Sequence, residues 1–321
     1  MTESVSPIGH GQSGGLIHHL NNRTEPETPR SNFEWLHYCI RHEGIEDLLC
    51  QQLGLPKFIA KAMVDEETRS RVIVRDDGIM VLFKAMHQHD GANPEMMVSL
   101  RLWLQQNRIV STRQQDIDAV LTLKQEIEAG EGPASTADFL IDLIGHVYDE
   151  FDPLIGEMER ELDLIEDLAS REETEAVCGR LATLERRAAI FVRHLAPQTA
   201  IFEQIAASRS LLIDDEGKDH LRELGSRLSG MLEVLREYRD RAQIVDQRIN
   251  RIEEFRQTKV NLLFAVAATL FLPATFLTGL FGVNVGGIPW LDSPSGFMII
   301  SGICVAMVAA SYVLIRSKRL M

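Results

Sequence analysis

Two long apolar stretches close the chain, at residues 260–281 and 296–315, and neither holds a charged side chain. Each has about the twenty residues that a bilayer core requires. A single stretch of this kind also suits the core of a soluble protein. Two such stretches in tandem, joined by a short segment rich in Gly and Pro, indicate two membrane-spanning helices instead. We therefore predict a transmembrane domain over residues 259–321, with a connecting loop at 282–295 and a tail at 316–321.

The segment before the first span has an unbroken heptad pattern, which predicts one long amphipathic helix. Its apolar positions recur at steps of three and four: Leu221, Leu224, Leu228, Met231, Leu235, Tyr238, Ala242, Val245, Ile249 and Ile252. No proline lies between Pro197 and Pro273. If the helix continues into the membrane it covers about sixty residues, or about 90 Å. This apolar seam then needs partners from its own chain or from other subunits.

A second stripe, which we call the path stripe, lies roughly opposite the seam. Its cytosolic part is polar and comprises Asp240, Gln243, Gln247, Asn250, Glu254 and Thr258. Within the span it is small or weakly polar, apart from one leucine, and comprises Asn261, Ala265, Ala268, Leu272, Thr275 and Gly279. Polar groups in hydrocarbon usually face a bundle interior or water. The stripe therefore predicts the lining of a shared pore; the alternative is a solvated face that aligns with the span by chance.

The first span contains no Asp, Glu, His or Cys. A dehydrated Zn²⁺ ion requires nitrogen, sulfur or carboxylate ligands, whereas a hydrated cation needs only hydroxyl, amide and carbonyl dipoles. The sequence thus favours passage with the water shell at least partly retained. Leu272 is the candidate for a hydrophobic constriction that gates by dewetting.

Residues 32–258 predict an α+β cytosolic domain, in which a sheet with flanking helices precedes the long helix. Strands are expected at 33–38, 71–75, 79–83, 97–104 and 108–112. A short helix is expected at 43–53 and further helices from Gln114 onward, with breaks at Pro197 and at 214–217. The Asp77-Gly78 step predicts a tight hairpin turn with positive φ. Residues 1–31, rich in Gly, Ser, His, Asn and Pro, predict a mobile tail.

The charge pattern sets the topology and excludes one class of partner. A net charge of −14 argues against binding of nucleic acid. Basic residues flank the two spans on one side: Arg248, Arg251, Arg256, Lys259, Arg316, Lys318 and Arg319. The connecting loop carries only Asp292, so the positive-inside rule places both termini in the cytoplasm. The acidic region 149–175 is either a solvated helix face or a surface that attracts cations.

Motifs for catalysis are missing from the sequence. It has no P-loop, no GxSxG and no HExxH, so no enzyme is predicted. The four cysteines are scattered, which argues against a disulfide framework or a zinc knuckle. His87-Gln88-His89-Asp90 is interpreted as a surface turn, and no signal peptide is expected.

Residues 281–290, Phe-Gly-Val-Asn-Val-Gly-Gly-Ile-Pro-Trp, resemble the outer loop of the CorA superfamily of divalent metal ion transporters, whose hallmark is Gly-Met-Asn. Here the tripeptide is Gly282-Val283-Asn284. The valine and the residues after it resemble the ZntB (zinc transporter) branch. Residues 65–71, 97–104 and 109–113 resemble the same branch, and the likeness covers the chain from about residue 32 to its end.

This resemblance implies a funnel-shaped homopentamer in the bacterial inner membrane, with the first span lining the pore and the second forming an outer ring. Asn284 would meet the hydrated cation at the outer mouth. The cargo implied is Zn²⁺, with Cd²⁺, Ni²⁺ and Co²⁺, linked to a proton gradient, and no other cofactor. Magnesium-type members often bear a regulatory carboxylate near the position of Gln247, which here is an amide.

Two other functions stay open. One is a CorA-type Mg²⁺/Co²⁺ channel, because the identity of the ion rests mainly on the loop. The other is a membrane-anchored coiled coil that binds partners and transports nothing. If protons are coupled, the candidates are Glu254, Asp240, Asp292 or the cytosolic acids.

Overall fold

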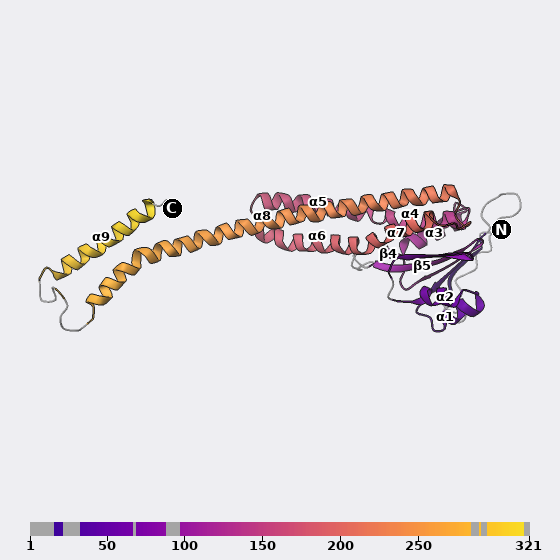
Figure 1. Cartoon of the computed structure of the whole chain (residues 1–321), viewed down its shortest axis with the longest axis horizontal. Coiled ribbons are helices and arrows are strands. Elements are labelled where there is room, and N and C mark those ends of the chain that lie inside the picture. Colours follow the sequence, from indigo (N-terminus) through magenta and orange to yellow (C-terminus); the bar gives the residue numbers. More distant parts are fainter. Residues whose placement is uncertain are drawn as a thin grey trace. The chain divides into compact units, whose positions relative to one another are not determined.

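The computed structural model describes residues 16–21, 33–66, 69–87, 97–283, 289 and 294–317. The chain divides into two compact units, Met1–Val245 and Asp246–Met321, and helix α8 (Asp215–Phe281) contributes to both (Figure 1). This division falls within the helix, upstream of the predicted start of the membrane domain at Lys259. The membrane boundary rests on charge rather than on contacts and stays a prediction.

The first unit contains a six-stranded sheet with strand order β1-β2-β6-β5-β4-β3. β2 and β6 are parallel, and the other neighbours are antiparallel. The strands are β1 (Leu16–Asn21), β2 (Glu34–Cys39), β3 (Arg71–Arg75), β4 (Gly78–Met86), β5 (Met97–Gln105) and β6 (Arg108–Arg113). The five strands predicted from the sequence are confirmed.

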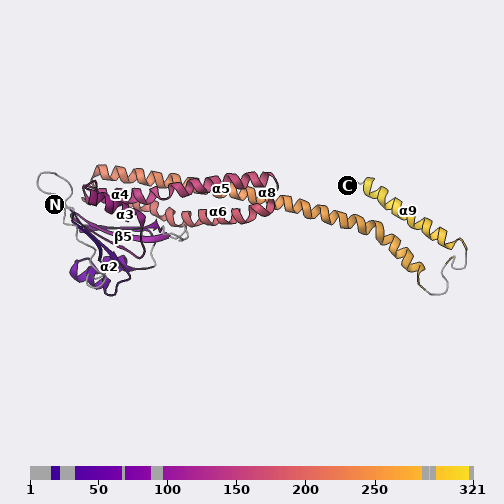
Figure 2. The same ribbon diagram turned by 180° about the vertical axis from the view of Figure 1, so that it is seen from behind.

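Helices cover both faces of the sheet (Figures 1 and 2). One face packs on α1 (Ile45–Asp47), the π-helix η1 (Leu48–Gln52) and α2 (Lys57–Val64), around a core that includes Leu36, Met80 and Trp103. On the other face, the ring of Phe139 in α4 packs edge-on against the ring of Trp35, with 4.8 Å between the ring centroids. Side chains alternate between the two faces along each strand, so most positions of the strands β2, β4, β5 and β6 are buried.

The remaining helices follow the sheet in the chain. They are α3 (Asp118–Ala129), α4 (Thr136–Asp149), α5 (Asp152–Ser170), α6 (Thr174–Leu195), the 3₁₀ turn η2 (Ala196–Gln198), α7 (Thr199–Ala206), α8 and, in the second unit, α9 (Gly296–Ser317). The predicted break at Pro197 is confirmed, because this residue lies in η2. The predicted break near 214–217 is present but lies earlier, between the end of α7 at Ala206 and the start of α8 at Asp215. Asp214 accepts a hydrogen bond from the Gly217 amide at 2.8 Å, so residues 215–217 already belong to the first turn of α8.

The N-terminal segment also differs from the expectation. Six residues of the predicted tail form β1, which pairs with β2. The ring of His18 stacks on the ring of His37, with 5.7 Å between the ring centroids. His37 is fully buried and neutral: Arg113 donates to its Nε2 at 2.9 Å, its Nδ1 lies 2.6 Å from the Ser111 hydroxyl, and burial lowers its pKa well below the usual value. The strand is therefore held by contacts distant in sequence, which composition does not reveal.

Two local predictions need correction. The helix expected at 43–53 is present, but after one α-turn it continues as a π-helix. The hairpin between β3 and β4 is also present, yet Gly78 does not have a positive φ. Its role is steric: a Cβ at this position would lie 2.6 Å from the Trp103 ring and 2.7 Å from the Leu104 carbonyl oxygen. Glycine lets β4 pass the buried indole.

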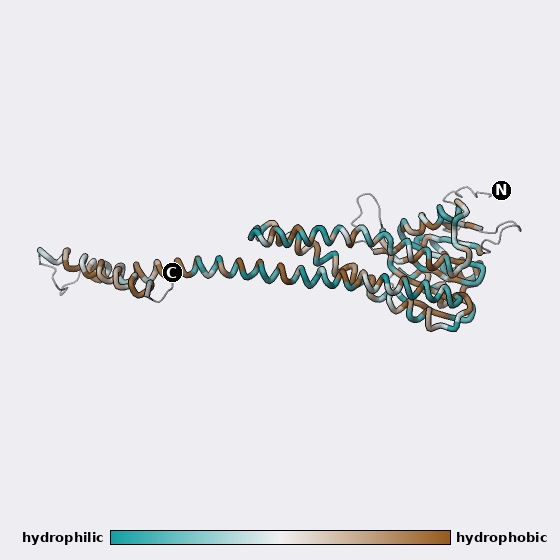
Figure 3. Tube along the Cα trace, turned by 90° about the horizontal axis from the view of Figure 1, so that it is seen from above, coloured by the Kyte–Doolittle hydropathy of each residue, from teal (hydrophilic) through white to brown (hydrophobic). Residues whose placement is uncertain are grey.

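The predicted heptad seam of α8 is confirmed in the first unit. Leu221, Leu228, Leu235 and Ala242 are fully buried, and the hydropathy of α8 alternates along its cytosolic part (Figure 3). Two arginines beside the seam reach α4 and α5. Arg227 donates to Asp149 and Asp152, both at 2.6 Å. Arg241 forms paired bonds with Glu166 at 2.9 and 2.8 Å and one with Asp163 at 2.8 Å.

We expect Gly78→Ala to destabilise the cytosolic unit by about 1–3 kcal/mol, as overpacking does, because neither a buried indole nor strand backbone can move away freely. Thermal unfolding of the solubilised full chain, followed by tryptophan fluorescence, measures the effect. Gly230→Ala is the matched control, since nothing lies within 4 Å of its Cβ and alanine favours a helix. Equal melting temperatures for the two variants would contradict the steric role.

Candidate functional site

Both C-terminal helices are long and apolar enough to cross a membrane. Their most apolar windows have mean hydropathies of 2.0 in α8 and 2.4 in α9, and only 6% of each window is buried. The core helix of a soluble protein would be mostly buried. Large apolar side chains such as Phe264, Phe271 and Phe297 are instead more than two-thirds exposed. This exposure suits a lipid environment or other subunits.

One side of the α8 span faces α9. Its half-buried residues recur at helical spacing: Val266, Ala267, Leu270, Pro273, Ala274, Leu277 and Phe281. Leu270 also lines an apolar groove with residues of α9, namely Cys304, Val305, Val308, Ala309 and Tyr312. Because successive residues turn by about 100° around a helix, these positions define a single covered face.

The path stripe lies on the opposite face of the same span. All six of its membrane residues, from Asn261 to Gly279, are exposed in the single chain, and Leu272 is 72% exposed. Its cytosolic members, Asp240, Gln243, Gln247, Asn250, Glu254 and Thr258, are exposed as well. The structure thus brings every predicted path residue onto one uncovered side of α8. The described part of the chain leaves this side exposed.

The threonines near the stripe satisfy their hydroxyls within the helix. Thr269 donates to the Ala265 carbonyl at 2.8 Å, and Thr278 donates to the Thr275 carbonyl at 3.1 Å. Such bonds let hydroxyls lie in an apolar environment. Pro273 lies inside the span and has no N–H, so the usual helical bond to the Thr269 carbonyl is missing. Leu272, Pro273, Thr275 and Phe276 line a shallow apolar hollow.

The predicted pore mouth is described only at its first two residues. α8 ends at Phe281, and the Gly282 amide donates to the Thr278 carbonyl at 2.9 Å. Val283 is half-exposed. Asn284 and Asp292 lie outside the described residues, so their roles stay predictions.

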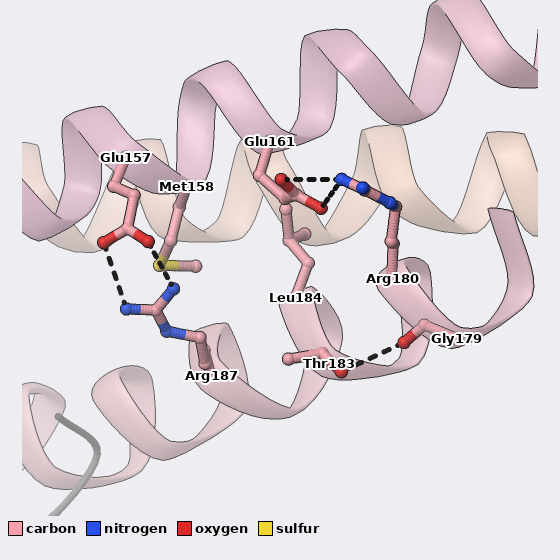
Figure 4. Close-up of a pocket in the computed structure, with 8 residues that line it drawn as sticks. All are labelled: Glu157, Met158, Glu161, Gly179, Arg180, Thr183, Leu184 and Arg187. Atoms are coloured by element: carbon pink, nitrogen blue, oxygen red, sulfur yellow. Dashed lines mark hydrogen bonds and ion pairs between the residues drawn. The ribbon is translucent and has the colours of Figure 1, made fainter. Parts of the chain in front are cut away.

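The acidic region 149–175 is extensively paired with arginines. Figure 4 shows two such pairs between α5 and α6, Arg180 with Glu161 at 3.0 Å and Arg187 with Glu157 at 3.4 Å. Met158 and Leu184 line the same hollow. Arg227 and Arg241 pair with four further carboxylates of this region. The pairs leave less free negative charge here than the sequence suggests. No group of three His, Cys, Asp or Glu that could hold a metal occurs in the described ranges.

The family model described as "CorA-like Mg2+ transporter protein" matches residues 30–319. The chain belongs to this family. It is 33% identical over 267 residues to the divalent cation transporter CmaX of Pseudomonas aeruginosa, covering 83% of this chain and 80% of that protein. It is 27% identical over 275 residues to the zinc transport protein ZntB of Yersinia enterocolitica, covering 85% and 84%. The structure of full-length CmaX has a TM-score of 0.79 at 30% identity, covering 97% of this chain and 99% of that one.

CorA-family membership confirms the resemblance, and the structure confirms the predicted sheet-and-helix domain followed by a very long helix and a C-terminal apolar helix. The pentamer stays a prediction. It also assigns the chain to membrane transport of divalent cations rather than to an enzyme family. Where the ion passes stays a prediction, for which the exposed face of α8 is the candidate.

The structure adds one titratable group that the sequence did not indicate. Glu150 caps the C-terminus of α4, and neither carboxylate oxygen forms a hydrogen bond of good geometry with the described residues. Its pKa is raised to about 7, mainly by burial; the Ala119 backbone amide opposes the rise, and the nearby charges of Asp118 and Asp149 add to it. Asp149 also binds Arg227 of α8. The protonation site on Glu150 is therefore adjacent in sequence to Asp149, which binds the long helix α8.

We expect Glu150→Gln to raise the melting temperature by a few degrees at pH 8. The pKa of Glu150 is about 7 in the folded chain against about 4.3 unfolded, so the ionised carboxylate destabilises the fold above pH 7. This penalty fades as the pH falls toward about 4.3, and the advantage of the variant should fade with it. Melting curves across this range, with the exposed Glu233→Gln as control, measure it. A gain independent of pH would contradict a buried, titrating carboxyl.

Proposed function

We propose that this protein transports Zn²⁺, and also Cd²⁺, Ni²⁺ and Co²⁺, as hydrated ions through the central pore of a homopentamer. The pore lies in the bacterial inner membrane, with both termini in the cytoplasm. The observation that carries the proposal is the path stripe: one side of α8, opposite the side facing α9, is uncovered from Asp240 to Gly279. After Glu254 the stripe contains no charged side chain.

The uncovered stripe requires an oligomer. Asn261 is exposed, and an amide facing lipid would lack hydrogen-bond partners. One helix cannot enclose an ion, but several copies of α8 around an axis would turn their stripes toward water. α9 would then lie outside the ring, because it packs on the opposite side. Identical subunits usually assemble with closed symmetry, and a ring of α8 helices around one axis has such symmetry.

The chemistry of the stripe supports a hydrated cargo. Alanine, glycine, threonine and asparagine offer dipoles to a water shell, but no ligand that could replace that shell around Zn²⁺. Acidic residues at the cytosolic end, such as Asp240 and Glu254, would raise the local concentration of cations. Transport would therefore depend on attraction and pore width rather than on tight binding.

Zinc is favoured over magnesium by the loop and by the relatives. Val283 stands where the hallmark has methionine, and one relative is named a zinc transport protein. A Mg²⁺/Co²⁺ channel is the second candidate, since the family model is described by magnesium. Proton coupling would draw on Glu254, Asp240, Asp292 or Glu150.

Purified protein in liposomes should admit Zn²⁺, and Asn284→Ala should abolish uptake without changing the size of the oligomer on gel filtration. The amide would lose its contact with the hydrated ion at the mouth. Zinc uptake that excess Mg²⁺ competes away would identify the magnesium-type channel instead. Repeating the assay with an imposed pH gradient tests coupling. Unchanged flux in the variant would rule out Asn284 as the mouth residue.

Leu272→Ala should raise the basal flux several-fold, because a smaller side chain lets water fill the constriction. Leu314→Ala is the matched control: its side chain has similar exposure, 62% against 72%, but belongs to α9. A leak equal in both variants, or in neither, would argue against a hydrophobic gate at Leu272.

A further inference from the structure

The covered side of α8 has a gap just below the span. The heptad positions that form the seam continue from Ile252 to Arg256, Lys259, Leu263 and Val266. The seam is buried at Ile249, half-buried at Ile252 and half-buried again from Val266. In between, Arg256, Lys259 and Leu263 are exposed. The apolar seam thus becomes cationic and uncovered for about three turns of the helix.

Three cations of this segment share one side of the helix. A turn of about 100° per residue places Arg248, Arg256 and Lys259 on the side of the seam, whereas Arg251 lies nearer the path stripe. Among the acids of the same segment, Glu254 lies on the path stripe, and Asp246 and Glu253 lie on the flank between the two sides. All seven side chains are exposed. Topology requires cations on the cytosolic side of a span, but it does not require them to share one face.

Apolar side chains continue the cationic face upward into the span. Val260 is 50% exposed and Leu263 is 67% exposed, and both lie within about 40° of Arg256 around the helix. Arg256 is about 6 Å along the axis from Val260, within the interfacial layer of about 5–8 Å on each side of a bilayer core. Cations at headgroup depth, followed by apolar groups at acyl-chain depth, match the two parts of a phospholipid.

We propose that Arg256, Lys259, Val260 and Leu263 form a lipid face that binds anionic phospholipid. The two cations bind the headgroup phosphate, and the two apolar side chains contact the upper acyl chain. This inference rests on the membrane placement in the proposed function, but not on the identity of the ion. It assigns opposite partners to the two sides of one helix: metal cations along the path stripe and lipid anions along the lipid face.

Lipid selectivity tests the proposal without any metal. The full chain is reconstituted in vesicles of phosphatidylcholine and phosphatidylglycerol with traces of spin-labelled lipid, and electron paramagnetic resonance gives the relative association of each. Wild type should select phosphatidylglycerol, less so at high salt. Arg256→Gln/Lys259→Gln should lower the selectivity by roughly five-fold for each cation removed. Arg256→Lys/Lys259→Arg, which keeps both charges, should retain it.

The matched control is Arg236→Gln/Arg239→Gln. Both arginines are exposed, have the same spacing and lie twenty residues earlier on α8, or about 30 Å from the lipid face; this variant should keep wild-type selectivity. No preference in wild type, as when a neighbouring copy covers the face, or an equal loss in both glutamine variants, would overturn the proposal. Zinc uptake in phosphatidylcholine vesicles is scored separately. Uptake without lipid selectivity overturns the lipid face alone, and selectivity without uptake overturns transport alone.

Discussion

The structure depends on covering the apolar seam of a single helix that passes through two solvents. α8 has 67 residues, about 100 Å at 1.5 Å per residue, and a helix of this length does not keep an apolar stripe exposed to water. In the first unit the seam is buried, and in the second unit α9 covers one side of the span. Burial contributes most of the stability, because partly exposed ion pairs such as Arg241 with Asp163 contribute little each. These pairs instead set the register of α8 against α5.

Fixing the seam also fixes what is left uncovered. Since one side of α8 is occupied along most of its length, the opposite side is available from the cytosolic end to Gly279. The same residues that a soluble protein would turn toward water continue into a stretch without charges. A helix that must pack on one side can thus present a continuous, weakly polar surface on the other.

The sequence predicts features that depend on neighbours along the chain. The heptad, the strands and the two spans are visible in residue type and spacing alone, and the path stripe follows from the same periodicity. The errors arise where the deciding contact is distant in sequence. β1 depends on pairing with β2 and on the stacking of His18 on His37. Gly78 depends on where β5 places Trp103, and the raised pKa of Glu150 depends on burial at the junction of α4 and α5. A local pattern carries no signal for these contacts.

The balance of charge explains how the candidate path could attract cations without retaining them. The chain has a net charge of −14, but much of its acidic region is neutralised by arginines of α6 and α8. On the juxtamembrane part of α8, Glu254 lies on the path stripe, and Arg256 and Lys259 lie on the side of the seam. A cation would therefore meet a favourable potential up to Glu254, and beyond it only dipoles that cannot replace its water. Strong ligands inside the span would bind Zn²⁺ tightly and slow its release, so a stripe without them suits conduction better than storage.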